Sequence, residues 1–258
     1  MTADELKSWR NARRADLLAR RESFDAATRA AWGRAISRTI SESFPLLAGK
    51  KLGIYWPIRA EFDPRFVAHE FRLKGAVIAL PVVRGKGQPL MFREWGPQTE
   101  MAKGGLDIPY PVNSPEITPD ACLVPPVGFD GNGYRLGYGA GFFDRTLAAL
   151  SPRPLAIGVA FECARIATIH PQPHDIALDF IVTELGVFAA RAAGLAATQA
   201  EEANHLAAGL VEARRLAHEA QAAPNAGELA SPVCYAREFV KDGPGYFAED
   251  PAQPRNKR

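Results

Sequence analysis

The sequence predicts an α/β fold with a mostly parallel central sheet flanked by helices, and three observations lead to this prediction. Five short apolar runs, rich in β-branched residues and separated by turn signals, are typical of buried parallel strands. The stretch at residues 63–75 has the pattern of a helix between the first two runs, which makes a βαβ unit. Another helical stretch at residues 142–150 follows a glycine-rich segment and ends before Ser151-Pro152.

The chain opens with a helical segment. Residues 3–43 contain no proline, and Leu6, Trp9 and Leu17 lie near helical spacing. Two helices fit this segment, with a break near residues 21–25.

Charge is unbalanced in this opening segment, although it balances over the whole chain. Arg10 and Arg14 stand four residues apart and would share one side of a helix. Nine basic residues outnumber the five acidic ones before residue 40, namely Lys7, Arg10, Arg13, Arg14, Arg20, Arg21, Arg29, Arg34 and Arg38. The first helix can therefore offer a basic face.

The five apolar runs are the expected strands. They read KLGIYW at residues 51–56, GAVIALPVV at 75–83, ACLVPP at 121–126, PLAIGVAF at 154–161 and LDFIVTE at 178–184. The helix between the first two runs has Pro64 in its first turn and Gly75 beyond its end. Proline is common at the start of helices and glycine is common just after their end.

The character of the chain changes beyond Phe188. Residues 189–223 are rich in Ala and Glu and predict a long helix, and residues 224–258 are rich in Pro, Gly and charge and predict a poorly ordered or weakly docked tail. We therefore expect an α/β domain at residues 1–190 and a helix with an irregular, partly disordered tail at residues 191–258. Leucines along the helix could pack on the main domain or on another subunit, so we expect a monomer, with a dimer as the alternative.

Composition excludes several classes of protein. A hydrophobic share of 47% and a charged share of 23% are those of an ordinary globular protein, and 31 Lys+Arg nearly cancel 29 Asp+Glu, so a nucleic-acid-binding surface is not expected. Cys122, Cys163 and Cys234 lie far apart without a CxxC spacing, which argues against disulfides and zinc knuckles. The charged N-terminus and the absence of a long apolar run predict a cytoplasmic protein with no membrane segment.

The glycine-rich segment GYRLGYGAGFFDR, at residues 133–145, has Gly137, Gly139 and Gly141 at alternate positions. A glycine loop that leads into a helix suggests backbone N–H groups facing an anion, with phosphate as the natural ligand. The spacing fits neither the Walker A motif nor the dinucleotide fingerprint, and a tight connection without a ligand is the alternative. Arg135 and Tyr138 favour the phosphate site.

Carboxylates near this loop suggest a magnesium site. Asp144 lies in the first turn of the predicted helix, where an acidic residue is also favoured by the helix dipole alone. Mg²⁺ is commonly held by one or two carboxylates together with phosphate oxygens and water. Further candidates around the last predicted strand are His174, Asp175, Asp179 and Glu184.

A zinc site is a weaker alternative. His170 and His174 have the four-residue spacing of zinc ligands on a helix, but Pro171 and Pro173 are incompatible with that helix. His174 is therefore expected to be a hydrogen-bonding loop residue.

These segments, taken in order over about residues 5–188, resemble the 5-formyltetrahydrofolate cyclo-ligase (5,10-methenyltetrahydrofolate synthetase) family. The matching parts are the basic first helix, YWPIRAE, IALPVV, LVPPVGFDGNGYRLGYGAGFFDR and PHDIALDFIVTE. The resemblance implies a three-layer fold shared with phosphosugar isomerases and CoA-transferases.

The resemblance also implies a reaction. An enzyme of this kind uses ATP as co-substrate and magnesium as cofactor to close 5-formyltetrahydrofolate to 5,10-methenyltetrahydrofolate, releasing ADP and phosphate through an iminium phosphate. Such a phosphoryl transfer depends mainly on positioning and on neutralising charge. No partner beyond these small molecules is implied.

Site residues follow from the matched positions. The ATP-binding set is Arg10, Arg14, Arg135, Leu136, Gly137, Tyr138, Gly139, Ala140, Gly141, Phe142 and Phe143, with Arg135 and Tyr138 as catalytic candidates. The folate-binding set is Trp56, Glu61, Tyr138, Gly139, Ala140, Gly141 and Phe142, and the magnesium carboxylates are Asp144 and Asp179.

Some positions depart from the pattern of the family. Arg10 stands where relatives usually have Lys, so Lys7 is an alternative phosphate contact. Ala140 adds a methyl group where relatives often have Gly or Lys, and Phe142 and Phe143 lack the hydroxyls that many relatives carry.

Two other functions remain open at this point. A phosphosugar isomerase or CoA-transferase relative would share the fold and need no ATP. A folate- or nucleotide-binding protein without catalysis would keep the site and make no product.

Overall fold

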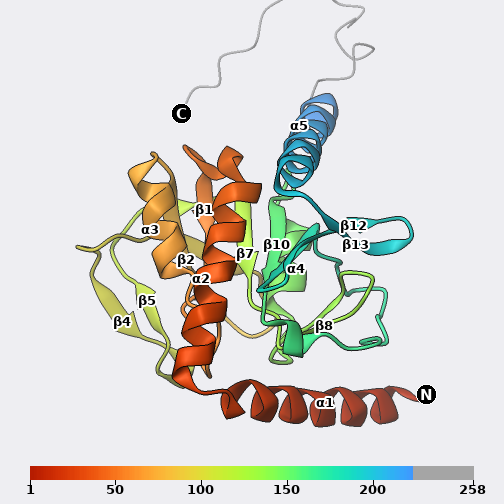
Figure 1. Cartoon of the computed structure of the whole chain (residues 1–258). Coiled ribbons are helices and arrows are strands. Elements are labelled where there is room, and N and C mark those ends of the chain that lie inside the picture. Colours follow the sequence, from red (N-terminus) through yellow and green to blue (C-terminus); the bar gives the residue numbers. More distant parts are fainter. Residues whose placement is uncertain (223–258) are drawn as a thin grey trace, which may run out of the picture. The chain divides into compact units, whose positions relative to one another are not determined.

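A nine-stranded sheet in the order β13-β12-β11-β10-β7-β1-β2-β3-β6 forms the centre of the computed structural model (Figure 1). The structure describes residues 1–222. Cys234 and the predicted tail at residues 224–258 lie outside the described residues. No helix within the described residues is long and apolar enough to cross a membrane.

The five strands at the centre of the sheet coincide with the five predicted apolar runs. They are β1 Lys51–Gly53, β2 Val77–Val83, β7 Ala121–Val124, β10 Leu155–Val159 and β11 Phe180–Thr183. Each pairs in parallel with its neighbours among the five. Every residue of β7, β10 and β11 is buried, as expected of parallel strands covered on both faces. The predicted mostly parallel sheet is confirmed.

Antiparallel strands, which were not predicted, extend the sheet at both ends. On one side lie β3 Leu90–Glu94 and β6 Glu116–Ile117, and on the other β12 Gly186–Arg191 and β13 Gly194–Thr198. Residues of these strands are only partly buried, so their sequences lack the continuous apolar run of a central strand.

The predicted C-terminal helix is confirmed, but the prediction that it starts directly after Phe188 is wrong. Residues 186–198 form the β12–β13 hairpin, and α5 begins only at Ala200 and runs to Ala222. Alanine favours helices, but pairing with β11 overrides this weak preference. The predicted division of the chain at residue 190 stays a prediction, and that residue lies inside β12.

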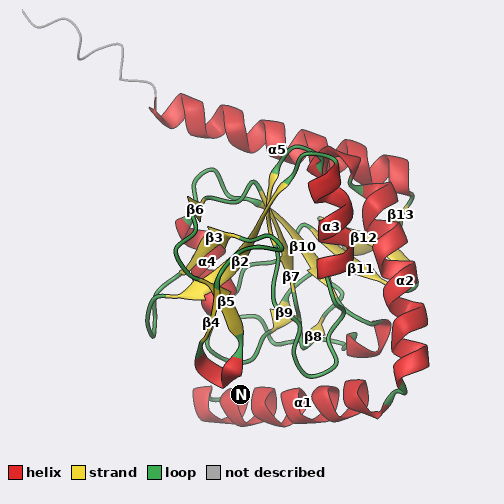
Figure 2. Cartoon of the chain, turned by 90° about the vertical axis from the view of Figure 1, so that its left-hand side faces the viewer, coloured by secondary structure: helices red, strands yellow, loops and turns green. Residues whose placement is uncertain are grey.

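Helices on both faces of the sheet give three layers (Figure 2). α2 Ala26–Ser43, α3 Arg65–Leu73 and the buried alanines of α5 pack in one core cluster on one face. α4 Phe142–Ala149 packs through Leu147 on the other face. The predicted three-layer α/β fold is confirmed, and so are its helices at residues 63–75 and 142–150.

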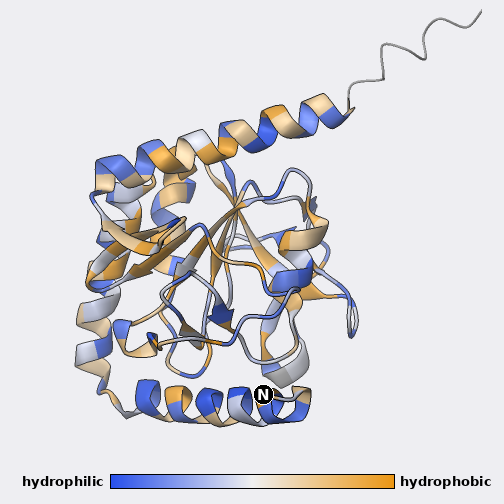
Figure 3. Ribbon diagram, turned by 90° about the vertical axis from the view of Figure 1, so that its right-hand side faces the viewer, coloured by the Kyte–Doolittle hydropathy of each residue, from blue (hydrophilic) through white to orange (hydrophobic). Residues whose placement is uncertain are grey.

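Alternation along the strands supplies both core clusters. In β2, Ile78 and Leu80 belong to the cluster under α2 and α3, while Ala79 between them belongs to the cluster under α4. Figure 3 shows the strands largely in the colours of apolar residues.

α1 Ala3–Ser23 lies beneath the sheet, apart from the other helices (Figure 1). Its N-terminus has a capping box made by Thr2 and Glu5, and Asp25 caps α2. The break between the helices therefore falls at residues 24–25, as predicted. Leu17 and Leu18 pack against the segment that follows β7.

Short elements surround the carboxyl ends of the parallel strands. β4 Met101–Lys103 pairs with β5 Pro109–Pro111, and β8 Gly128–Phe129 pairs with β9 Arg135–Leu136. Among the described residues, 3-10 turns also follow at Gly105–Asp107 and Glu162–Ala164, whereas the turn at Pro45–Leu47 precedes β1 at the amino ends of the strands.

The strand order locates the expected ligand crevice. From β1 the chain goes to β2 on one side, and it later returns to place β7 on the other side. The connection reverses direction between β1 and β7, and such a switch point opens a crevice at the carboxyl ends of the strands.

Candidate functional site

A cavity of about 820 Å³ lies at this switch point. Its wall includes Tyr55 and Trp56 just after β1, Pro125 just after β7, and the end of β2. α1 and the glycine-rich segment complete the wall. The cavity therefore joins parts of the chain that are distant in sequence.

Almost all the predicted site residues line this cavity. They are Arg10, Arg14, Trp56, Glu61, Arg135, Leu136, Gly137, Tyr138, Gly139, Ala140, Gly141, Phe142, Phe143 and Asp144. Lys7 and Asp179 are not part of the wall. Lys7 is exposed, so Arg10 is the residue of the two that reaches the cavity.

The glycine loop has a conformation that explains two of its glycines. Gly139 and Gly141 have φ angles of +101° and +64°, which side-chain-bearing residues rarely adopt. Gly137 has no such angle, and a Cβ placed on it would meet no atom within 4 Å. Gly137 thus leaves space open, while the other two allow the turn.

Backbone N–H groups of this loop are free to bind a ligand. Within the described residues, no hydrogen-bond partner is present for the N–H groups from Tyr138 to Asp144. The last three of these residues form the first turn of α4, whose first intrahelical bond is donated by Arg145 N–H to the Gly141 carbonyl. Unpaired N–H groups at a helix N-terminus attract anions such as phosphate.

A buried ion pair supports the start of α4. Arg135 Nη2 lies 2.9 Å from Asp144 Oδ1, and the side chains are 3% and 20% exposed. Asp144 Oδ1 also accepts from the Ile176 N–H, and Arg135 donates to the Ile176 carbonyl. Burial lowers the pKa of Arg135, while Asp144 and Asp175 act in the opposite direction.

Arg10 and Arg14 extend from α1 to the same wall. Arg10 donates to Asp175 Oδ2 at 2.6 Å and to the carbonyls of Ile169 and His170. Arg14 donates to the Gly137 carbonyl at 2.7 Å. Burial, and next the charge of Arg10, lower the pKa of Arg14. The basic face of α1 therefore meets the glycine loop, as the spacing of the two arginines suggests.

The opposite part of the wall carries a buried carboxylate. Tyr138 Oη donates to Glu61 Oε1 at 2.7 Å and accepts from Arg21 at 2.9 Å. Burial raises the pKa of Glu61, while the Ile58 N–H, Tyr138 and Arg21 lower it. Burial and the charge of Glu61 raise the pKa of Tyr138 well above its ordinary value.

Apolar side chains form much of the remaining wall. Trp56 packs edge-on against Trp95 with ring centroids 6.3 Å apart, and the Arg65 guanidinium lies 4.4 Å from its ring centroid. Phe142 and Phe143 also face the cavity, and Pro81, Val82, Val83, Leu90, Ile108 and Tyr110 complete this side. Such a surface suits a flat heterocycle.

The expectation that Asp179 joins Asp144 at a magnesium site does not fit the structure. Asp179 directly precedes β11, at the amino ends of the parallel strands, whereas the cavity lies at their carboxyl ends. Its carboxylate binds Arg153 at 2.5 Å and Arg214 at 2.6 Å, and it also accepts from the Ala156 N–H. These contacts give Asp179 the role of an anchor for α5.

Two residues of the site were not singled out by the sequence. Asp175 lines the cavity and binds α1 through Arg10, and Arg21 binds both Tyr138 and Glu61. Asp175 stood only among several acidic candidates. The sequence does contain an indication that Arg21 is buried, because Arg21 lies one helical turn after Leu17 on the same buried stripe of α1.

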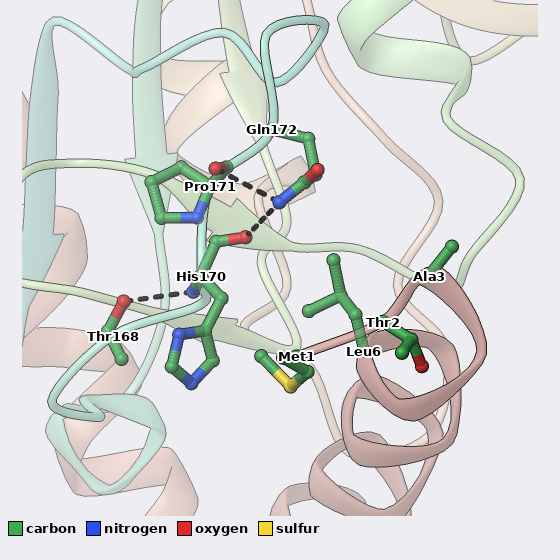
Figure 4. A pocket seen from close by; sticks show the side chains of 8 residues that line it. All are labelled: Met1, Thr2, Ala3, Leu6, Thr168, His170, Pro171 and Gln172. Carbon is green, nitrogen blue, oxygen red and sulfur yellow. Dashed lines mark hydrogen bonds between the residues drawn. The ribbon is translucent and has the colours of Figure 1, made fainter.

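A second cavity, of about 480 Å³, lies beside the N-terminus of α1 (Figure 4). Its wall combines the first residues of the chain with Thr168, His170, Pro171 and Gln172. Gln172 donates to the carbonyls of His170 and Pro171, so these polar groups satisfy one another.

Comparison with known proteins agrees with this architecture. The model of the 5-formyltetrahydrofolate cyclo-ligase family matches residues 6–184. The chain is similar to the 5-formyltetrahydrofolate cyclo-ligase of Mycolicibacterium smegmatis, with 32% identity over 154 residues that cover 56% of this chain and 79% of the relative. That of Escherichia coli is 27% identical over 146 residues, which cover 54% and 80%.

Solved structures show the same fold. The 5,10-methenyltetrahydrofolate synthetase of Aquifex aeolicus superimposes with a TM-score of 0.62 and 27% identity, over 70% of this chain and 93% of that chain. For that of Mycoplasma pneumoniae the TM-score is 0.57, at 22% identity, over 68% and 98%. Because the family model spans the chain from α1 through β11 and so includes every predicted wall residue, this chain belongs to the 5-formyltetrahydrofolate cyclo-ligase family.

Proposed function

We propose that this chain uses ATP and magnesium to cyclise 5-formyltetrahydrofolate to 5,10-methenyltetrahydrofolate, with release of ADP and phosphate. One observation supports this most strongly. The N–H groups from Tyr138 to Asp144, which have no partner in residues 1–222, share one cavity with the apolar wall around Trp56 and with the buried carboxylate of Glu61. A phosphate ligand and a flat heterocycle would therefore meet in the same space.

The nucleotide phosphates would bind at the glycine loop. Its N–H groups and the start of α4 provide donors and partial positive charge, and Arg14 adds a cation beside Gly137. Arg10 lies on the same wall but already binds Asp175 and two carbonyls. We therefore assign Arg14 to the phosphates and give Arg10 the role of fixing α1 to the loop at residues 169–175.

Magnesium would be held by Asp144 together with phosphate oxygens and water, an arrangement that Mg²⁺ commonly adopts. Asp144 Oδ1 is engaged by Arg135 and Ile176, while Oδ2 has no hydrogen-bond partner among the described residues. Asp175 supplies a second carboxylate on the same wall. The metal, when bound, neutralises charge on the phosphoryl oxygens.

The folate would bind at the apolar side. Trp56 and Phe142 offer faces for the pterin ring, and Glu61 offers a carboxylate that accepts hydrogen bonds from ring N–H groups. Because Phe142 and Phe143 have no hydroxyl groups, we propose that they act by packing alone.

The reaction then needs two steps in this cavity. The formyl oxygen attacks the γ-phosphorus of ATP, and the bond to the bridging oxygen of ADP breaks. The neighbouring folate nitrogen next attacks the formyl carbon, the bond from carbon to the phosphorylated oxygen breaks, and phosphate departs as that nitrogen loses its proton. Holding the formyl oxygen in line with the γ-phosphorus is the main contribution that the chain can make.

Arg135 and Tyr138 would act on this reaction in different ways. Arg135 is almost fully buried and holds Asp144 in place, so it positions the carboxylate that faces the metal. Tyr138 is 39% exposed at the crest of the loop, between the phosphate and folate sides. Its hydroxyl is bound to Glu61, so we propose that it orients that carboxylate.

A spectrophotometric assay tests this function. Purified chain supplied with 5-formyltetrahydrofolate, ATP and magnesium should develop the absorbance of the methenyl product, and omission of ATP or of magnesium should abolish it. Binding of both substrates by calorimetry with no product would favour a folate- or nucleotide-binding protein instead. Turnover of a phosphosugar or CoA ester without ATP would favour the relatives that share this fold.

Two further expectations accompany this function. We propose a cytoplasmic location and a monomeric state, with the α5 helix as the surface of a dimer if one forms. Fractionation of cells and the solution mass of the purified chain would check them.

A further inference from the structure

Arg21 lies behind the cavity wall rather than in it. Its side chain is 6% exposed, and it belongs to the buried stripe of α1 with Leu17 and Leu18. Arg21 Nη2 donates to Tyr138 Oη at 2.9 Å and lies 3.8 Å from Glu61 Oε1. A buried arginine thus contacts a side chain from each of two cavity loops.

The geometry fixes the direction of these hydrogen bonds. A guanidinium group can only donate, so the Tyr138 hydroxyl must accept from Arg21. The hydroxyl proton is then available for Glu61, whose oxygen lies 2.7 Å away. Arg21, Tyr138 and Glu61 therefore form one ordered chain of donors and acceptors that ends on the carboxylate.

α1 also holds the turn that carries Glu61. Arg59 and Ala60 have φ angles of +49° and +59°, a conformation that residues with side chains adopt at a cost. Arg21 Nε donates to the Arg59 carbonyl at 2.9 Å, and Glu22 binds the Arg59 guanidinium with both oxygens. These contacts from α1 keep the two residues in this conformation.

The turn closes on Glu61 itself. The Ile58 N–H donates to Glu61 Oε2, and the Glu61 N–H donates to the Ile58 carbonyl. One carboxylate oxygen is therefore used by the turn, and the other faces Tyr138 and Arg21.

Burial alone would favour a neutral Glu61. Burial raises the pKa of Glu61, and the Ile58 N–H, Tyr138 and lastly Arg21 only partly offset this rise. The titratable and charged groups that face Glu61 are Arg21 from α1, Tyr138 from the glycine loop and Tyr55 after β1. Arg21 is the only cation among these groups of the described part of the chain.

We propose that Arg21 is a positioning residue for folate binding, which fixes the Glu61 carboxyl group and holds Tyr138 against it. This inference rests on the proposed function, because it takes a pterin ring as the partner of Glu61. Arg21 itself touches no substrate in this arrangement. Its effect reaches the ring through the oxygen of Glu61 that faces Tyr138 and through the turn at residues 58–61.

The test compares Arg21→Gln with the wild-type chain in steady-state kinetics at several pH values. Loss of a charge-assisted hydrogen bond should raise the KM for 5-formyltetrahydrofolate about 10- to 100-fold. The KM for ATP should change much less. Without the cation the pKa of Glu61 rises, so the acid limb of kcat/KM for the folate should move to higher pH.

Two matched variants separate the effect of the position of Arg21 from the effect of its positive charge. Arg20→Gln removes the neighbouring charge, which is exposed on α1, and should behave like the wild type. Arg21→Lys keeps the cation and should return the acid limb toward its wild-type position while only partly restoring the KM.

Several results would overturn the inference. One is an Arg21→Gln variant whose KM values and pH profile match those of Arg20→Gln. Another is an equal loss for both substrates with an unmoved acid limb, since that would indicate a purely structural role. Should Arg21→Gln fail to fold, Tyr138→Phe still tests the chain of hydrogen bonds, and an unmoved acid limb in that variant contradicts it.

Failure of the proposed function would look different. If the wild-type chain binds 5-formyltetrahydrofolate but forms no product, calorimetry can compare folate affinity in the same variants, and Arg21→Gln should still bind at least tenfold more weakly. If the wild-type chain binds no folate, both the function and the inference are wrong.

Discussion

Gly139 and Gly141 adopt positive φ angles, and the residues between Tyr138 and Asp144 leave their N–H groups without partners in the described part of the chain. A left-handed residue with a side chain costs roughly 1–2 kcal/mol, which explains why the turn uses glycine. The alternate spacing of the glycines thus reflects conformation at two positions and open space at Gly137.

Asp144 and Asp179 should respond differently to substitution, although both resemble metal ligands in sequence. Asp144→Asn should raise the magnesium concentration needed for half-maximal turnover by tenfold or more, because Asp144 lines the cavity beside the glycine loop, where we propose that the phosphates bind. Asp179→Asn should leave that requirement unchanged. A magnesium titration of the two variants, run beside the wild type, measures this.

Asp179→Asn should instead lower stability. The substitution leaves Arg153 and Arg214 without their carboxylate, and Asp179 is 7% exposed. We expect a loss of about 2 kcal/mol in the free energy of unfolding, below the value for a fully buried pair because both arginines keep some solvent contact. Denaturant unfolding checks it, and a raised magnesium requirement with unchanged stability would restore Asp179 to the metal site.

Strands were predictable at the centre of the sheet, where most of their residues are buried. The five parallel strands consist mostly of apolar residues, so each produces a run that stands out in the sequence. The outer antiparallel strands β3, β12 and β13 are half exposed and carry Ala, Arg and Glu, residues that give no strand signal of their own. Their formation depends on a neighbour that has already folded, which a local pattern does not contain.

The packing of α5 on the core cluster can be tested by substitution. Ala203 and Ala207 are fully buried in the core cluster with α2 and α3, while Ala208 is exposed. Ala207→Asp would bury a carboxylate without a partner and should cost about 3 kcal/mol or more, which lowers the melting temperature by about 10 °C. Ala208→Asp should melt within about 1 °C of the wild type. Calorimetry decides it, and equal melting of the two variants would mean that α5 does not pack on the sheet.

At the scale of the whole molecule, the site depends on contacts between distant segments. Arg10 binds Asp175 across 165 positions, Arg14 binds Gly137 across 123, and Tyr138 binds Glu61 across 77. Motifs on each segment indicated the glycine loop and the basic helix separately. The glycine loop and the basic helix come together because of the strand order at the switch point between β1 and β7. The same strand order brings Asp175 and Arg21 to positions that support them. No single segment of the sequence contains that order.

Ligands that bridge these segments should stabilise the described fold as a unit. Each ligand at about 100 times its dissociation constant adds about 2.7 kcal/mol to the free energy of unfolding, which corresponds to a rise in melting temperature of roughly 5–10 °C for a chain of this size. We expect ATP with magnesium and 5-formyltetrahydrofolate each to raise the melting temperature. Asp144→Asn should diminish the rise given by ATP with magnesium and keep the rise given by the folate, because we propose that this carboxylate serves only the phosphate side. Thermal unfolding with each ligand alone measures these changes in melting temperature. Hydrogen exchange should also show that α1 is more protected in both complexes, since Arg14 and Arg21 connect α1 to the two sides of the cavity. A folate-induced rise that disappears in Asp144→Asn would show that the two ligands do not occupy separate sides of one cavity.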